Sequence, residues 1–309
     1  MTDKAAIRPM LQTRSTYGRE PEGRRPASIT AARVGVYAFL GFAALFFLLP
    51  LYVMVITSLK PMAEVRLGNL FSWPVDPTVG PWIKAWSSAC TGVDCEGIQV
   101  GFLNSIKILI PSVVLSVGAG AFNGYALSFW RPRGANVLFA ILLVGAFIPY
   151  QVFLFPMVQM LSAVSLYNSL AGIIIVHVIF GLPVMTLLFR NYYSGIPIEL
   201  FNAARIDGAG FFRIFLQIIL PMTVPIIVVA MILQVTSIWN DFLFGVTFAG
   251  RLNFPMTVQL NNIVNTTMGE REYNVNMAAT MITALVPLAV YFLSGRWFVR
   301  GIAAGAVKG

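Results

Sequence analysis

Long apolar runs separated by short polar segments restrict the possible folds of this chain more than any other feature. Each run has about twenty or more residues, enough for a helix to cross the hydrocarbon of a bilayer. A backbone that faces lipid must satisfy its own hydrogen bonds, and the runs do not alternate as barrel strands do. We therefore expect an all-α membrane protein with six transmembrane helices, near residues 34–58, 102–129, 136–157, 170–189, 224–244 and 277–297.

The basic residues predict how these helices are oriented. Charged residues make up only 11% of the chain, too few for a soluble surface. Basic residues gather before and at the start of the first run, in 131–133, in 190–213 and in the C-terminal tail, as is typical of cytoplasmic segments, and this location argues against the nucleic-acid partner that a net charge of +9 could suggest. We therefore expect both termini in the cytoplasm (N-in, C-in), with the loops at 60–101 and 247–276 outside.

We expect the membrane domain to span residues 31–296. The segments before and after it differ from it in composition. Residues 1–30 are polar and rich in Arg, Pro and Ser, and the segment is too long for the first part of a signal peptide. We expect a disordered basic cytoplasmic tail, which either sets the orientation alone or also binds a partner. Residues 297–309 are expected to form a short cytoplasmic tail.

The chain has two cysteines, and both lie in the first outer loop. Cys90 and Cys95 could form a small disulfide loop in an oxidising compartment. A metal site would need further ligands, and none is evident nearby. His177 is the single histidine, and a structural role suits it better than ligation. Because no nucleophile and base pattern occurs in the apolar runs, we expect no catalytic residues and set an intramembrane enzyme aside.

The segment of about 191–222, between the fourth and fifth runs, predicts two helices on the cytoplasmic face. Pro197 and Glu199 suit a first helical turn, since proline is tolerated there and a carboxylate favours the positive end. Gly208 and Gly210 then end the first helix, and an amphipathic second helix follows. Such a surface could dock into a groove of another protein. The residues alone do not say which protein.

This segment resembles the EAA loop of binding-protein-dependent ABC importer permeases. The family pattern is EAA, three residues, Gly, nine residues, Ile, one residue and Leu-Pro. Asn202 departs from it, because it stands where the family has Glu and carries no charge. Residues 239–243 (WNDFL) resemble the carbohydrate branch of this family. Residues 298–309 resemble the C-terminus of the maltose-type second permease subunit in that branch. The residues that match the EAA pattern are Ala203, Ala204, Gly208, Ile218, Leu220 and Pro221.

The resemblance implies a type I ABC importer permease in the bacterial inner membrane. Its partners would be a second permease subunit in a heterodimer, two ATPase subunits, an extracytoplasmic sugar-binding protein and the lipid bilayer. ATP and magnesium would bind the ATPase subunits, so no cofactor is expected here, and no G-x-x-x-x-G-K-[ST] motif occurs in the chain. The alternatives are a permease for another solute, such as an amino acid or phosphate, and a secondary carrier that needs no ATPase.

The resemblance also implies which residues contact the ATPase subunits. In the coupling loop they are Glu199, Asn202, Ala203, Ala204, Asp207 and Gly208. In the C-terminal tail they are Gly305 and Lys308, unless that tail is only a frayed end.

Polar side chains within the apolar runs are candidates for a substrate site, because burying them in a membrane is costly. Sugars are held by aromatic faces and by fixed hydrogen-bonding groups. We therefore expect substrate contacts from Tyr150 and Gln151 and from Trp239, Asn240 and Asp241. Hydrogen bonds between helices are the alternative role for each of them.

Overall fold

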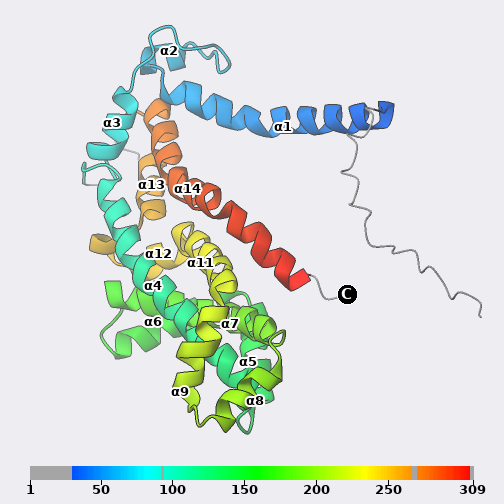
Figure 1. The fold of residues 1–309 in the computed structure, drawn as a ribbon. Coiled ribbons are helices and arrows are strands. Elements are labelled where there is room, and N and C mark those ends of the chain that lie inside the picture. Colours follow the sequence, from blue (N-terminus) through cyan, green and yellow to red (C-terminus); the bar gives the residue numbers. More distant parts are fainter. Residues whose placement is uncertain (1–29, 92–93, 266–269, 307–309) are drawn as a thin grey trace, which may run out of the picture. The chain divides into compact units, whose positions relative to one another are not determined.

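The computed structural model of the protein describes residues 30–91, 94–265 and 270–306, with residues 295–306 described by their backbone alone. Every regular element in these ranges is a helix (Figure 1). The chain divides into two units within α1 (Ala31–Ser58), after Leu51. The first unit is the greater part of this helix, and its large apolar side chains, such as Phe39 and Phe47, are exposed. An apolar helix with so much exposed surface needs lipid or another protein around it.

Four helices of the described chain have the length and composition of membrane spans: α1, α4 with η1 (Gln99–Trp130), α7 (Leu170–Tyr193) and the first part of α14 (Tyr273–Ser294). Two bent pairs raise the number to six if each pair is one span. In one pair, α5 (Ala135–Phe147) leads through η2 (Tyr150–Phe153) into α6 (Leu154–Ala163), with a bend of 100°. In the other, residues Phe211–Met222 meet α11 (Val224–Trp239) at 79°.

The third and fifth apolar runs are not the continuous helices that the sequence predicts. The third breaks at Ile148 and Pro149, because the residue before a proline is driven out of the helical region; Ile148 has φ −74° and ψ 129°. The fifth ends at Trp239. The carboxylate of Asp241 then accepts the backbone N–H groups of Phe244 and Gly245, which starts a separate short helix, α12 (Leu243–Phe248).

The helix that contains the sixth span is longer than the sequence predicts. The helix α14 runs from Tyr273 to Ala306, so the backbone stays helical well past residue 297, where a tail is expected.

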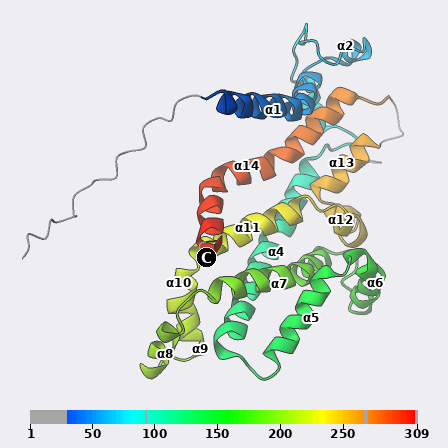
Figure 2. The same ribbon diagram turned by 90° about the vertical axis from the view of Figure 1, so that its right-hand side faces the viewer.

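The packing of α4 (Gln99–Tyr125) against α7 depends on small residues. A Cβ atom on Gly120 would lie 2.4 Å from the Cβ of Met185, and one on Gly124 would lie 2.8 Å from the Cβ of Phe189. The two helices approach so closely that only glycine fits at both places. On its other side α7 contacts α5 (Figure 2).

Short helices lie at the two ends of the second unit (Figures 1 and 2). One end carries the short helices α2 (Met62–Arg66), α3 (Gly80–Ser87) and α13 (Met256–Val264), together with η4 (Arg251–Asn253). Cys90 and Cys95 are joined there by a disulfide. Ion pairs connect its two long loops: Asp94 with Arg251, Lys84 with Glu272, and Arg66 with Glu270.

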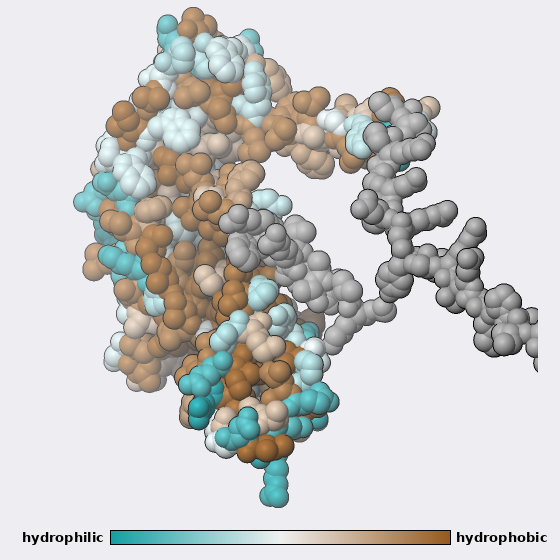
Figure 3. All heavy atoms as spheres, in the orientation of Figure 1, coloured by the Kyte–Doolittle hydropathy of each residue, from teal (hydrophilic) through white to brown (hydrophobic). Residues whose placement is uncertain are grey.

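The opposite end carries α8 (Ile198–Ile206) and α9 (Phe211–Ile214), followed by η3 (Phe215–Ile219) and α10 (Leu220–Met222). Hydrophobic residues dominate the visible face of the helical body, whereas hydrophilic residues gather around this end (Figure 3). This distribution is the one expected of a helical body in lipid with a hydrated end.

Candidate functional site

The helix α8 stands at one end of the molecule, and local signals fix both of its ends. Pro197 precedes its first residue with an extended backbone, φ −57° and ψ 129°. At the other end Gly208 has φ +79°, a left-handed conformation that glycine adopts without strain. The N–H of Gly208 donates to the carbonyl of Arg205, and that of Ala209 donates to the carbonyl of Ala204. This is a Schellman motif, which satisfies the last carbonyls of the helix.

The helix turns two different faces to its surroundings. Phe201 is 2% exposed and Ala204 is 7% exposed, so both pack inside this chain. The other predicted coupling residues are exposed and available to another protein: Glu199, Asn202, Ala203, Asp207 and Gly208. The side chain of Ile206, a residue that the sequence does not single out, is 86% exposed. The structure therefore separates Ala204, which holds the helix in place, from the other five.

Phe201 inserts into a group of rings that we call the aromatic seat: Tyr125, Phe129, Trp130, Phe201 and Phe211. The ring of Phe201 stacks on Phe129 at 5.2 Å and meets the edge of Trp130 at 5.6 Å. Trp130 lies 5.1 Å from Phe211, which lies 4.9 Å from Tyr125. Each such ring pair adds about 0.5–1.5 kcal/mol beyond the burial of its area. The seat therefore joins α8 to α4 and α9 firmly.

Hydrogen bonds reinforce the aromatic seat. The indole Nε1 of Trp130 donates to the hydroxyl of Tyr125 over 2.7 Å, and that hydroxyl donates to the backbone carbonyl of Phe211 over 3.0 Å. The guanidinium of Arg205 lies 5.3 Å from the centre of the Trp130 ring, a cation–π distance. The rings of Phe129 and Trp130 come from η1, a single π-helical turn (Ala126–Trp130) that continues α4. Because packed side chains deform little, a displacement of α8 must carry the end of α4 with it.

A cavity of about 990 Å³ lies deeper in the helical body, between α5, α7 and α11. Both breaks in the apolar runs reach it, through Tyr150 after the first break and through Asn240 and Asp241 after the second. Non-helical backbone is tolerated at membrane depth where it lines such a cavity. The other polar residues in its lining are His177, Gln234 and Ser237.

The cavity combines aromatic faces with polar groups. Tyr150 meets the edge of Phe244 at 5.2 Å, and Phe180 stacks on Phe244 at 5.0 Å. The Nε2 atom of His177 lies 3.9 Å from a carboxylate oxygen of Asp241. The side chain of Asn240 is exposed at the end of α11. Stacking faces beside amide, imidazole and carboxylate groups suit a polar, hydroxyl-rich solute.

Two predicted substrate residues lie elsewhere. Trp239 is 1% exposed, and its Nε1 donates over 3.0 Å to the carbonyl of Thr283, so it joins α11 to α14. Gln151 is exposed and is not part of the cavity lining. Of the residues predicted from the sequence, the structure brings Tyr150, Asn240 and Asp241 together.

The predicted contacts of the C-terminal tail are only partly within the described chain. Gly305 lies in the last turn of α14, whereas Lys308 lies outside the described residues. In the part of the chain that the structure describes, no group of three His, Cys, Asp or Glu side chains could hold a metal ion.

The aromatic seat and the part that Gln234 has in the cavity are not predicted from the sequence. The spacing of Phe122, Tyr125 and Phe129 on one helical face is a usable signal for a ring cluster. Their meeting with Phe201 and Phe211 depends on the tertiary fold, which no local pattern gives.

Comparison with known proteins agrees with this geometry. A family model described as "Binding-protein-dependent transport system inner membrane component" matches residues 106–305. A probable ABC transporter permease protein of Pyrococcus horikoshii is 35% identical, over 91% of this chain and 99% of its own length. The alpha-glucoside transport system permease protein AglG of Rhizobium meliloti is 37% identical, over 70% of this chain and 58% of its own.

Among solved structures, a bacterial ABC transporter involved in the import of the acidic polysaccharide alginate has a similar fold. The TM-score is 0.72, with 88% of this chain and 99% of that chain covered, at 21% sequence identity.

Proposed function

The chain belongs to the family of inner membrane components of binding-protein-dependent transport systems, and we propose on that premise that its cargo is a sugar. Members of this family are the membrane permeases of ABC importers, and ATP is hydrolysed by separate subunits. The chain is accordingly a multi-pass membrane protein with the type I importer fold. The similarity to a relative named for alpha-glucoside transport supports a sugar as the solute.

One observation carries the proposal for coupling: α8 presents an exposed face at the end of the molecule while its other face is fixed in the aromatic seat. We propose that this exposed face, from Glu199 to Gly208, docks into an ATPase subunit. The partners are then two ATPase subunits, a second permease subunit and an external sugar-binding protein. The α8 end lies in the cytoplasm, and the end with the disulfide lies outside.

The cavity supports a role in solute passage. Tyr150, Asn240 and Asp241 supply an aromatic face and hydrogen-bonding groups of the kind that hold sugars. The second permease subunit would complete the cavity. A permease for a non-sugar solute is the competing proposal, which the composition of this lining favours less.

In this mechanism the chain converts motion at α8 into a change at the cavity. ATP brings the two ATPase subunits together and displaces α8. The aromatic seat passes the displacement to α4 and α9, and through η3 and α10 to α11, which ends at the cavity with Asn240. ATP acts because it binds one state of the ATPase dimer better than the other.

The test is purification of the tagged chain from its native membrane in mild detergent, with mass spectrometry of the proteins that come with it. Ala203→Arg places a long charged side chain on the exposed face of α8 without backbone strain. We expect the wild type to retain an ATPase subunit and this variant to lose it. Ala63→Arg is the matched control, because Ala63 is exposed in a short helix at the opposite end.

Both variants must elute as the wild type does in size-exclusion chromatography, which excludes misfolding. If the wild type retains no ATPase subunit, or if Ala203→Arg retains as much as Ala63→Arg, the docking face is elsewhere.

A further inference from the structure

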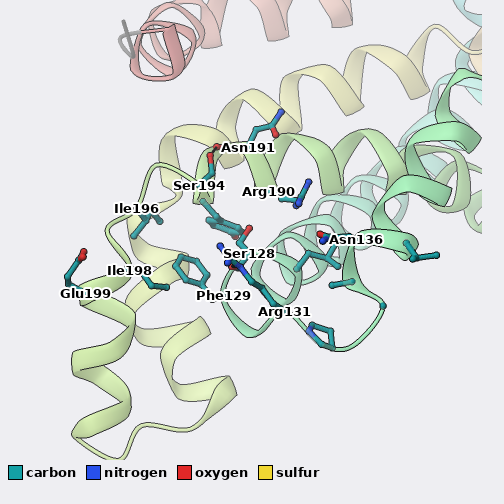
Figure 4. A pocket seen from close by; sticks show the side chains of 16 residues that line it. Ser128, Phe129, Arg131, Asn136, Arg190, Asn191, Ser194, Ile196, Ile198 and Glu199 are labelled. Atoms are coloured by element: carbon teal, nitrogen blue, oxygen red, sulfur yellow. Dashed lines mark hydrogen bonds between the residues drawn. The ribbon is translucent and has the colours of Figure 1, made fainter.

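A second pocket, of about 960 Å³, lies at the α8 end of the molecule and has a polar lining (Figure 4). It is formed by the turn between η1 and α5, the last turns of α7 and the residues that lead into α8. Of the residues assigned to the proposed docking face, only Glu199 lines this pocket, and the solute cavity shares none of its lining residues. The polar residues that matter to its chemistry are Arg131, Arg190, Asn136, Ser128 and Ser194. Glu199 lies at its edge, and Figure 4 shows this side chain apart from the two arginines.

The arginines of this pocket are held in place but not neutralised. The Nε of Arg131 donates to the carbonyl of Ser128 over 3.0 Å, and the guanidinium of Arg190 lies 3.8 Å from the ring centre of Phe139. Of the ion pairs among the described residues, none includes Arg131, Arg190 or the neighbouring Arg133. Two fixed guanidinium groups without a carboxylate partner favour a phosphate, which they can bind through paired hydrogen bonds.

An apolar groove of about 630 Å³ begins at the same place. Asn136 and Val137 line both the polar pocket and the groove, which continues along α5 past Ala140 and Val144 to Ile148, a residue that also lines the solute cavity. The described length of α5 is 13 residues, or about 20 Å of helix. One leaflet of hydrocarbon is about 15 Å thick, so the groove is long enough for an acyl chain.

We propose that the pocket and the groove together bind one anionic phospholipid. Its phosphate lies between Arg131 and Arg190, and one acyl chain follows α5. Basic pockets between spans on the cytoplasmic side are typical sites for such headgroups. A free phosphate would leave the groove empty, so the continuity of the two spaces favours a lipid. This inference rests on the membrane orientation proposed above.

The experiment is a titration of the delipidated importer with phosphatidylglycerol, followed by native mass spectrometry, with the zwitterionic phosphatidylcholine, which has no net charge, as the reference. The importer is used without ATP or sugar, so the result does not depend on coupling. We expect the double variant Arg131→Gln and Arg190→Gln to bind phosphatidylglycerol about tenfold more weakly, and Arg133→Gln to stay within about twofold of the wild type. Arg133 is the matched control, because it belongs to the same turn but does not line the pocket.

Filling the groove tests the acyl chain separately. Ala140 lines the groove and none of the other cavities, so Ala140→Phe should weaken binding of phosphatidylglycerol and leave the two arginines in place. Binding unchanged in the double arginine variant or in Ala140→Phe would overturn the proposal. Displacement of the lipid by millimolar inorganic phosphate would do so too, since it would identify a simple anion site.

The second permease subunit is the other possible occupant of the groove. A photoreactive diazirine analogue of leucine in place of Val144, which lines the groove, should cross-link to lipid in the assembled importer if lipid occupies the groove. Cross-links from this position to the second permease subunit would show that protein covers the groove and would refute the lipid. If no ATPase subunit co-purifies with the wild type but the titration gives the expected pattern, the proposed coupling role is wrong and the lipid site is supported.

Discussion

Single residues hold α8 in position, and Gly208 shows this through its backbone. Its φ is +79°, whereas Gly210, two residues on, has φ −79° and ψ 175°, an ordinary extended conformation. A Cβ would meet nothing within 4 Å at either position. Gly208→Ala should therefore lower stability by about 1 kcal/mol through backbone strain alone, and Gly210→Ala should not. Thermal unfolding of the two purified variants measures the difference, and equal melting temperatures would contradict the left-handed cap.

The hydroxyl of Tyr125 is a second prediction at this scale. Tyr125→Phe keeps the ring and removes the hydrogen bonds with Trp130 and the carbonyl of Phe211. Because Tyr125 is fully buried, no water replaces its hydroxyl as the partner of the Trp130 indole N–H and the Phe211 carbonyl. We therefore expect the free energy of unfolding to fall by about 1–3 kcal/mol. We also expect less ATPase stimulation by the loaded binding protein, since α8 loses part of its connection to α4.

The control for Tyr125 is Tyr192→Phe. Tyr192 donates to the carbonyl of Met222 over 3.1 Å in an exposed position, where water replaces the lost hydroxyl. Its loss should cost well under about 1 kcal/mol. Stimulated ATPase activity and thermal unfolding are measured on both variants. An equal loss of stimulated ATPase activity in Tyr125→Phe and Tyr192→Phe would mean that the aromatic seat does not transmit motion.

At the scale of elements, the packing of α4 against α7 makes two glycines of one helix behave in opposite ways. Gly124→Ala forces a methyl group to within 2.8 Å of Phe189 and should cost about 1–3 kcal/mol. Gly118 faces open space on the same helix, so Gly118→Ala should gain up to about 1 kcal/mol from helix propensity. Unfolding of each variant in mild detergent gives the sign of each change. A destabilised Gly118→Ala would argue that a partner subunit packs on that face.

The sequence predicts where the apolar runs lie better than it predicts where they break. Hydropathy depends on composition alone, so the regions of α4, α7 and α11 can be located without knowledge of their neighbours. The break at Pro149 has a local cause, although proline also occurs inside intact helices here, as at Pro111 and Pro183. The break after Trp239 has a less local cause, because Thr257 also binds the carbonyl of Asp241 over 2.5 Å.

The candidate site was predictable to the same extent. The motif around Ala203 and Gly208 is contiguous in sequence, so its resemblance to the EAA loop can be recognised without knowledge of the fold. The cavity contains residues from several helices, and the sequence predicts the same role for the neighbouring residues Trp239 and Asn240. A step of one residue along the backbone sends Trp239 toward α14 and leaves Asn240 at the cavity, a difference that only the packing decides.

At the scale of the whole molecule, the orientation in the membrane connects every proposed role. The face of α8 must lie in the cytoplasm to meet an ATPase subunit, and the lipid site must lie in the cytoplasmic leaflet. The opposite end must lie outside, where an oxidising environment would maintain the bond between Cys90 and Cys95. Because that disulfide leaves no free cysteine among the described residues, and the sequence has only these two cysteines, engineered single cysteines can report the orientation cleanly.

Ala63→Cys and Ala203→Cys place a thiol at exposed positions of the two opposite ends. In intact cells, an impermeant maleimide should label Ala63→Cys at once and Ala203→Cys only after the membrane is permeabilised. The positive-inside bias predicts this order, because the α8 end carries Arg131, Arg190 and Arg205 without carboxylate partners within the described chain. The reverse order would place α8 outside and remove the coupling proposal and the cytoplasmic lipid site together. Labelling of neither thiol before permeabilisation would put both ends inside and require an even number of spans between them.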